Sequence, residues 1–184
     1  MRAARKVPQE SLAGSLLLAH PSLRDSNFRR TVVLMTAHGP DGAMGVIVNR
    51  PLQKRLGDLG GDFVLGPLAD VPVFEGGPVQ TEQLILAGWR AQPHGFQLHM
   101  GIDPEKAGLL FAEEGAQIRA FLGHAGWTGG QLEDELKRQS WIVTDAPPDL
   151  FTQQTDQALW RLFLGREGAM WRILADEPDD PGVN

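Results

Sequence analysis

The chain contains no cysteine and no tyrosine among its 184 residues. The lack of cysteine excludes disulfides, iron–sulfur clusters, thiolate zinc sites and a cysteine nucleophile. The lack of tyrosine leaves histidine, aspartate, glutamate and lysine for any acid–base role. Apolar runs such as Leu16–Ala19 are far shorter than the roughly 20 residues that span a bilayer. We therefore expect no transmembrane helix.

The beginning of the chain shares only some features with a secretory signal. Three basic residues precede the apolar stretch Leu12–Ala19, as they would in a signal peptide. Gly14 interrupts that stretch, and no A-x-A cleavage site follows it. The sequence therefore predicts a flexible basic N-terminus over residues 1–10 and a cytoplasmic protein.

Composition indicates one globular domain. Hydrophobic residues make up 42% of the chain and charged residues 22%, which is close to the average for globular proteins. The 22 glycines and 13 prolines predict many tight turns between short elements. We expect a single domain over residues 11–175, followed by an acidic disordered tail over residues 176–184.

The net charge of −6 is unevenly distributed. Residues 1–92 carry ten basic and eight acidic side chains, a net +2, whereas residues 93–184 carry seven and fifteen, a net −8. DNA-binding proteins depend on dense positive charge to neutralise phosphates. An acidic chain without such a stripe disfavours direct DNA binding.

The pattern of apolar residues predicts strands and helices without regular alternation, which favours an α+β fold. Two β-branched runs, 31–37 and 43–48, are joined by a loop of turn residues and predict a β-hairpin. Further strands are expected at residues 71–74, 84–87, 96–100, 117–122 and 141–144.

Helix-capping signals predict the helices. Asp103 followed by Pro104 predicts an N-cap and a helix to about residue 114. Thr128 and Gln131 have the spacing of a capping box, so Thr128 is expected as the N-cap of a helix that ends near residue 140. A short helix is expected at 52–60, and a longer one at 150–164 that ends at Gly165.

No catalytic motif stands out. The sequence lacks H-E-x-x-H, G-x-S-x-G, Walker A and G-x-G-x-x-G patterns, so we predict no catalytic residues, no metal and no cofactor. The doublets Gly76-Gly77 and Gly129-Gly130 allow tight turns or the close approach of a phosphate. Glu75 is a carboxylate beside the first doublet. It is a better candidate for a base than Glu133 and Glu135, whose i, i+2 spacing places them on different sides of a helix.

Several segments, in order, resemble the YqgE/AlgH family of bacterial proteins. They are His20-Pro21 to Phe28, Gly42 to Pro51, Gly76 to Val79, and Gly123 to Glu133 with Glu135 and Trp141. In this chain His124 stands where the family usually has an aromatic residue, and residues 97–115 follow the family pattern loosely. The resemblance implies one cytosolic α+β domain with a mixed, strongly curved, barrel-like β-sheet flanked by helices.

The resemblance implies no agreed biochemical activity, although many members are labelled transcriptional regulators. Our leading hypothesis is a non-enzymatic accessory or regulatory protein that binds a protein partner or a small anionic ligand. The alternatives are a hydrolase or phosphate-handling enzyme using Glu75 or His124, and a direct transcriptional regulator. A homo-oligomer is the general expectation for soluble proteins. The predicted binding groove consists of Asn49, Arg50, Gly76, Gly77, Pro78, His124, Trp127, Gly129, Gly130 and Gln131, with Arg50 as the anion contact.

Overall fold

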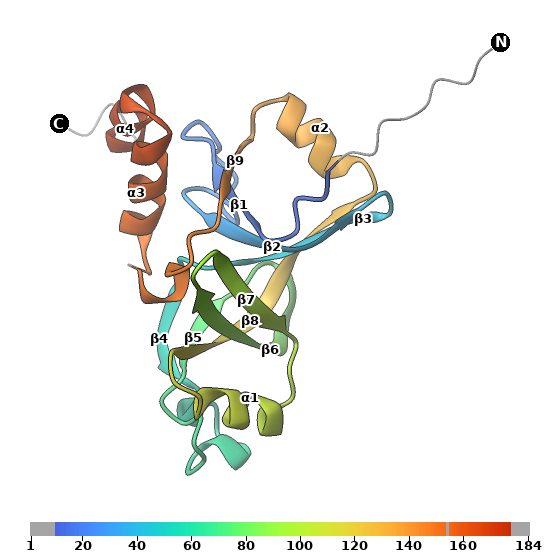
Figure 1. Cartoon of the computed structure of the whole chain (residues 1–184). Helices are drawn as coiled ribbons and strands as arrows, with labels where there is room; N and C mark the ends of the chain where they lie inside the picture. The colour runs from blue at the N-terminus through green and yellow to red at the C-terminus, as the bar shows by residue number, and fades with distance from the viewer. Residues whose placement is uncertain (1–9, 154, 178–184) are drawn as a thin grey trace.

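The computed structural model describes residues 10–153 and 155–177 (Figure 1). The predictions for the terminal segments 1–10 and 176–184 fall largely outside these described residues. The strands are β1 (Ser15–Ala19), β2 (Val32–Gly39), β3 (Gly42–Ile47), β4 (Pro51–Arg55), β5 (Pro72–Glu75), β6 (Val79–Gln92), β7 (Gly95–Met100), β8 (Ala116–Thr128) and β9 (Trp141–Asp145). The α-helices are α1 (Pro104–Phe111), α2 (Gln131–Lys137), α3 (Gln157–Glu167) and α4 (Ala169–Asp176), and short 3₁₀ helices cover Leu56–Leu59, Gly61–Phe63 and Leu150–Thr152. No helix in the described residues is long and apolar enough to cross a membrane.

Strand β8 joins two halves of one mixed, nine-stranded sheet. Its first part, Ala116–His124, pairs with β6, and within this part Ala120–Leu122 also pairs with β5 in parallel. Its last part pairs with β3. The change of partners falls at Gly123, whose φ of +73° lies in the left-handed region that glycine adopts readily. The chain thus bends where the two halves meet.

We call the two halves the upper and lower lobes. The upper lobe contains β1, β2, β3, β9 and the helices α2, α3 and α4, and the lower lobe contains β4 to β7, α1 and the segment 56–71 (Figure 1). The outer strands of the path are β4 and β9, which do not pair with each other. The expected α+β class with a mixed sheet flanked by helices is confirmed. The sheet is open, so its likeness to a barrel is limited to its curvature.

Strand β1 explains how the upper lobe is packed. Leu16 and Leu18 face a cluster formed with α3, whereas Leu17 faces the opposite cluster, which includes Leu132 of α2. Alternate side chains of a strand point to opposite faces of the sheet. Because helices cover both faces, the four buried positions Leu16–Ala19 are all apolar, and only Ser15 at the start of the strand is polar.

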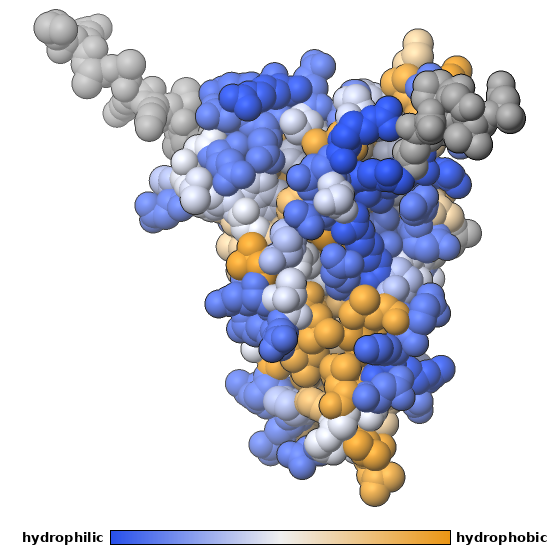
Figure 2. Space-filling view, turned by 180° about the vertical axis from the view of Figure 1, so that it is seen from behind, coloured by the Kyte–Doolittle hydropathy of each residue, from blue (hydrophilic) through white to orange (hydrophobic). Residues whose placement is uncertain are grey.

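A third buried cluster forms the core of the lower lobe and contains Leu56, Val73 and Ile118. This lobe also exposes much apolar surface. Leu65 is 97% exposed, and Val64, Leu109 and Phe111 are also exposed. Figure 2 shows hydrophobic side chains gathered on one face of the lower half of the molecule. In the upper lobe, Met170 and Ile173 of α4 are exposed as well, so both lobes leave some apolar side chains uncovered.

The structure confirms the hairpin, which is formed by β2 and β3, and the N-cap at Asp103, whose side chain accepts from the Lys106 N–H at 2.8 Å. The helix expected at 52–60 is wrong in its first half, which forms β4 and pairs with β5. Only Leu56–Leu59 is helical there, as a 3₁₀ turn.

Two predicted helices have wrong boundaries. Helix α2 begins at Gln131 with Gly130 as its N-cap, because Gly130 adopts a φ of +81°. The Gln131 side chain still accepts from the Thr128 N–H at 3.1 Å, which is one half of the expected box. The helix expected at 150–164 begins only at Gln157, because the Asp156 side chain caps it, and it continues through Gly165 to end at Gly168.

Candidate functional site

Asn49 follows β3 and is 3% exposed. Its Oδ1 accepts from the Val32 N–H at 2.8 Å. Its Nδ2 donates to the carbonyl oxygens of Arg30 at 3.0 Å and Asp156 at 3.3 Å. Asn49 thus connects the start of β2 with the cap of α3, and its amide satisfies backbone groups of the fold.

Arg50 lies on a small cavity of about 440 Å³ that also contains Ser26, Arg29, Asp156 and Gln157. Its Nη1 donates to the Asn27 carbonyl oxygen at 2.7 Å. Its Nη2 donates to two further carbonyl oxygens of the same loop, those of residues 26 and 29, at 3.3 Å. The N–H groups expected to bind an anion therefore already hold the loop before β2.

Gly76 and Gly77 lie where the chain crosses from β5 to β6 over β8. A Cβ on Gly76 would lie 2.2 Å from the Gly123 oxygen, and one on Gly77 would lie 2.2 Å from the His124 carbonyl. Gly76 also accepts from the Ile47 N–H at 2.8 Å. The sequence predicted a tight turn or the close approach of a phosphate at this doublet. In the structure, the group that approaches it is the backbone of β8 at Gly123 and His124. Pro78 follows the doublet on the surface.

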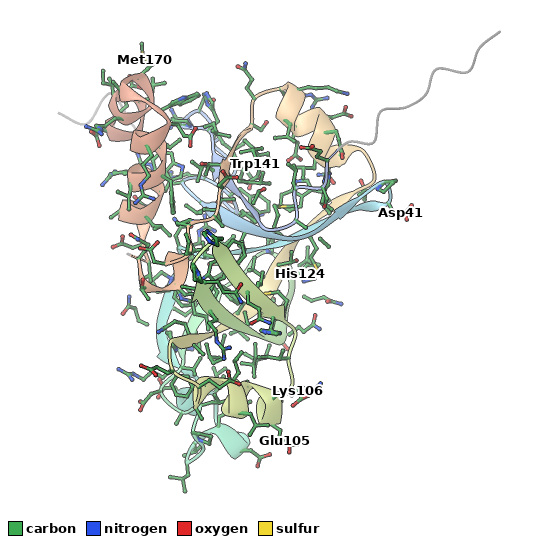
Figure 3. All side chains as sticks on the ribbon, viewed as in Figure 1. Asp41, Glu105, Lys106, His124, Trp141 and Met170 are labelled. Carbon is green, nitrogen blue, oxygen red and sulfur yellow. The ribbon has the colours of Figure 1, made fainter. Side chains whose placement is uncertain are left out.

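His124 and Glu75 are the residues of the enzyme hypothesis. His124 pairs with Val79 in the β6–β8 ladder, and Figure 3 labels it near the junction of the two lobes. Its Nδ1 is buried and has no hydrogen-bond partner among the described residues. The Glu75 side chain is 43% exposed and lies 3.6 Å from Arg50 Nη1. No hydrogen bond joins these two residues within the part of the chain that the structure describes.

The last candidates, Trp127 to Gln131, lie at the other end of β3. Ala43, at the start of β3, pairs with Trp127, whereas Asn49 and Arg50 follow the end of that strand. The structure thus brings Arg50, Gly76, Gly77 and His124 to one region and places Trp127, Gly129, Gly130 and Gln131 in another. A Cβ on Gly129 would lie 2.6 Å from the Pro40 oxygen, so this doublet also fits against backbone.

Glu135 organises this second region, although the sequence pointed to it as part of the family resemblance and not as a site residue. Its Oε2 accepts from the indole N–H of Trp127 at 2.9 Å and from that of Trp141 at 2.8 Å. Its Oε1 accepts from the Gln131 amide at 3.0 Å. Figure 3 labels Trp141 below α2. The i, i+4 spacing of Gln131 and Glu135 was the available signal, but the two indoles come from different strands.

A second polar pair, His38 and Glu133, also holds α2. His38 Nε2 lies 2.8 Å from Glu133 Oε1, and His38 Nδ1 accepts from the Leu12 N–H at 3.0 Å. Since Nδ1 is an acceptor, Nε2 carries the proton and donates to the carboxylate. This hydrogen bond lowers the pKa of Glu133. In residues 10–153 and 155–177, no three acidic or histidine side chains gather as a metal site.

A cavity larger than the one beside Arg50 lies in the lower lobe, and none of the predicted site residues lines it. It measures about 770 Å³. The segment 59–68 forms one wall, and β6 with Leu122 of β8 forms the other. Most of the lining side chains are apolar, and two carboxylates, Asp62 and Glu82, lie among them. We call this cavity the lower groove; its lining residues are Leu59, Gly60, Gly61, Asp62, Phe63, Gly66, Pro67, Leu68, Thr81, Glu82, Leu84, Pro104 and Leu122.

The bent α+β sheet has counterparts among solved structures. Protein DIP2367 from Corynebacterium diphtheriae gives a TM-score of 0.73 at 24% identity and covers 94% of this chain and 95% of its own. The solution structure of the AlgH protein from Pseudomonas aeruginosa gives a TM-score of 0.66 at 24% identity, with 96% and 99% covered. At this identity the likeness defines the fold class.

Sequence comparison gives the family. The family described as AlgH-like (DUF179) matches residues 16–172. The UPF0301 protein SCO2948 from Streptomyces coelicolor is 38% identical over 188 residues, which cover 95% of this chain and 96% of that protein. The chain therefore belongs to the AlgH-like family, as its motifs predicted. The names of these relatives state no activity.

Proposed function

We propose that this protein is a non-enzymatic accessory or regulatory protein that binds a partner protein through the lower groove. The main support for this proposal is the groove itself, which has a volume of about 770 Å³ and largely apolar walls. Cavities of roughly 300–1,000 Å³ with apolar walls and a few polar groups are typical of binding sites. A soluble protein also gains stability by burying apolar side chains, so an apolar groove that stays open to solvent needs a reason.

The occupant that fits is a short apolar segment of a partner protein, flanked by lysine or arginine. Leu59, Phe63 and Leu84 offer apolar contacts for its side chains. Asp62 and Glu82 offer carboxylates to its basic flank, and neither makes an ion pair with another described residue. Insertion of an apolar face into a groove is a common mode of peptide recognition. Complementary charge at the rim would orient the segment and raise its association rate.

This proposal accounts for a regulatory role without direct DNA binding. The chain carries a net charge of −6, and the groove adds carboxylates to an apolar surface. Such a surface repels phosphates, which supply most of the affinity of DNA-binding proteins. Regulation would therefore act through the bound protein.

Selection from a displayed library of random peptides tests the proposal with a defined probe. We expect enriched peptides to carry spaced apolar residues beside lysine or arginine. Their affinity, measured by fluorescence anisotropy, should fall at least tenfold for Leu59→Ser and about threefold or more for Glu82→Lys.

Matched controls come from residues of α1 that do not line the groove, which α1 touches only through Pro104. Leu109 is 68% exposed, and Glu105 lies on the first turn of α1 (Figure 3), so Leu109→Ser and Glu105→Lys should bind the peptides as the wild type does. Failure to enrich peptides, or equal losses in the controls, would contradict the proposal. Concentration-dependent dimerisation that Leu59→Ser abolishes would instead assign the groove to a second copy of the chain.

A further inference from the structure

Arg119, on β8, is a buried cation. It is 3% exposed, and its guanidinium carbon lies 4.8 Å from the ring centre of Phe74 and 4.4 Å from that of Phe151. Burial lowers its pKa to about 10, so the side chain still carries a positive charge near neutral pH. The two aromatic faces provide cation–π stabilisation but supply no counter-charge.

The hydrogen bonds of this guanidinium are incomplete. Nη2 donates to the Phe151 carbonyl oxygen at 2.7 Å. Nη1 is buried and has no hydrogen-bond partner within residues 10–153 and 155–177, and no described carboxylate forms an ion pair with Arg119. Burying a charge without a partner is unfavourable. The structure therefore leaves one strong donor of Arg119 without an acceptor among the described residues.

Arg119 lines a cavity of about 530 Å³ between β4, β5, β8 and the segment that follows Pro148. This cavity shares no lining residue with the lower groove. Its walls combine apolar side chains, such as Val73 and Phe111, with the amides of Gln53, Gln117 and Gln153. The cavity is thus large enough for a small organic molecule and has both apolar and hydrogen-bonding surfaces.

The edge strand β4 brings further positive charge to the same cavity. Its residues Gln53, Lys54 and Arg55 all line the cavity, although neighbours in a regular strand point to opposite faces. The register of β4 on β5 shifts between Pro51 and Lys54, and Gln53 has a φ of +55°. Such bulges redirect side chains and are common beside binding sites. Arg55 is paired with Asp70 at 2.9 Å, whereas Lys54 makes no ion pair with a described residue.

We propose that this cavity binds a small organic molecule that carries a carboxylate. A carboxylate oxygen accepts from Arg119 Nη1 in the interior, and Lys54 supplies a second positive charge at the edge strand. A carboxylate fits better than a phosphate dianion, because only one buried cation faces the cavity. The apolar walls contact the body of the ligand, and the glutamine amides bind its remaining polar groups.

Thermal unfolding at constant ionic strength tests this site, with benzoate and succinate as probes and inorganic phosphate as the comparison. A carboxylate at ten times its Kd should raise Tm by about 3–6 °C in a chain of this length. Phosphate at the same concentration should give a clearly smaller shift. An equal shift with phosphate would overturn the assignment to carboxylates.

Variants connect the shift to the named residues. Arg119→Met keeps the apolar stem and should abolish the shift, and Lys54→Gln should weaken the Kd about three- to tenfold. Lys106→Gln is the matched control, because Lys106 is exposed on α1 outside the cavity (Figure 3), and should leave the Kd unchanged.

If Arg119→Met does not fold, the titration of Lys54→Gln with the same probes tests whether this cavity binds the carboxylate. The proposal is overturned if neither probe shifts Tm, or if Lys54→Gln binds them as the wild type does. The groove variants Leu59→Ser and Glu82→Lys should bind benzoate normally. Loss of carboxylate binding can therefore be distinguished from loss of peptide binding.

Discussion

Two regions of this protein present an arginine to a cavity, and they use it in opposite ways. In the crossing region, formed by Arg50, Gly76 and Gly77, the guanidinium of Arg50 donates to three carbonyl oxygens of one loop. In the Arg119 cavity, the guanidinium is more deeply buried but has one hydrogen bond and an unpartnered Nη1. Both arginines line a cavity, but of the two only Arg119 has a buried donor without a hydrogen-bond partner among the described residues.

The difference separates structural arginines from candidate binding arginines. A charged group whose donors are satisfied by backbone carbonyls stabilises the fold, and removing it leaves those carbonyls without a partner. A buried charge without a counter-charge lowers the stability of the empty protein. Such an arrangement favours a ligand that completes it. The two regions should therefore respond differently to the same substitutions.

The largest effect is expected at Gly76. A Cβ there would overlap the Gly123 oxygen at 2.2 Å and would also lie 3.0 Å from the Phe121 Cβ. Both neighbours belong to β8, so relief requires the backbone that crosses from β5 to β6 to move away from β8. We expect Gly76→Ala to lower the free energy of unfolding by about 4 kcal/mol or more. Urea denaturation measures this.

The control for Gly76→Ala is Gly39→Ala, since a Cβ on Gly39 meets no atom within 4 Å. This variant should stay within about 1 kcal/mol of the wild type. Equal stability of Gly76→Ala and the wild type would show that the crossing region tolerates added volume. The doublet would then be open to a ligand, contrary to our account.

The second prediction compares the two arginines directly. Arg50→Met should lower the free energy of unfolding by about 2–4 kcal/mol, because three carbonyl oxygens lose a charged donor. Arg119→Met should change it by about 1 kcal/mol or less, or raise it, because it removes an uncompensated buried charge. Urea denaturation of both variants in ligand-free buffer gives the two values.

A larger loss of stability in Arg119→Met than in Arg50→Met would contradict the distinction between the two arginines. A large loss for Arg119→Met would make Arg119 a structural residue, and an unchanged Arg50→Met would return Arg50 to the candidate binding residues. Arg55→Met provides a surface control, because the Arg55–Asp70 pair is largely exposed. Exposed ion pairs contribute about 0–1 kcal/mol.

The smallest effect concerns Glu133, another polar group whose hydrogen bonds are satisfied within the fold. The hydrogen bond from His38 lowers the pKa of Glu133. Its stabilising contribution is therefore present above the pKa of an unfolded glutamate and is lost as the pH falls through the lower, folded value. The wild type should exceed Glu133→Gln in stability at pH 7, and the difference should shrink towards pH 3.

Urea denaturation across this pH range gives the comparison, with Asp134→Asn as the control because the Asp134 side chain is 64% exposed. A difference between the wild type and Glu133→Gln that stays constant from pH 7 to pH 3 would mean that the His38 hydrogen bond does not favour the charged carboxylate. The polar contacts of α2 would then be weaker than we infer.

The sequence predicted the class of fold because its signals are local. The β-branched, apolar runs of β2 and β3 and the cap at Asp103 depend on neighbouring residues, and the structure confirms them. The boundary errors arose where two local signals competed. At α2, the left-handed conformation of Gly130 outweighed the capping-box pattern of Thr128 and Gln131.

The candidate sites were harder to predict because they depend on contacts between distant segments. The glycine doublet was correctly expected to allow close approach, but the group that approaches is the backbone of β8, which no local pattern reveals. Arg119 lies within a run expected to form a strand, and its aromatic neighbours are Phe74 and Phe151. Only the tertiary structure shows that its charge has no ion-pair partner among the described residues.

An NMR titration with benzoate tests the central comparison most directly, because one spectrum reports on both arginine regions. In ¹H–¹⁵N correlation spectra of the full chain, we predict saturable shifts of the amides of Gln117 to Ala120 and of Gln53 and Lys54. The amides of Asn27 and Arg50 should stay in place. Shifts centred on Asn27, Arg50 and Glu75, with none near Arg119, would contradict the account and make Arg50 the anion contact.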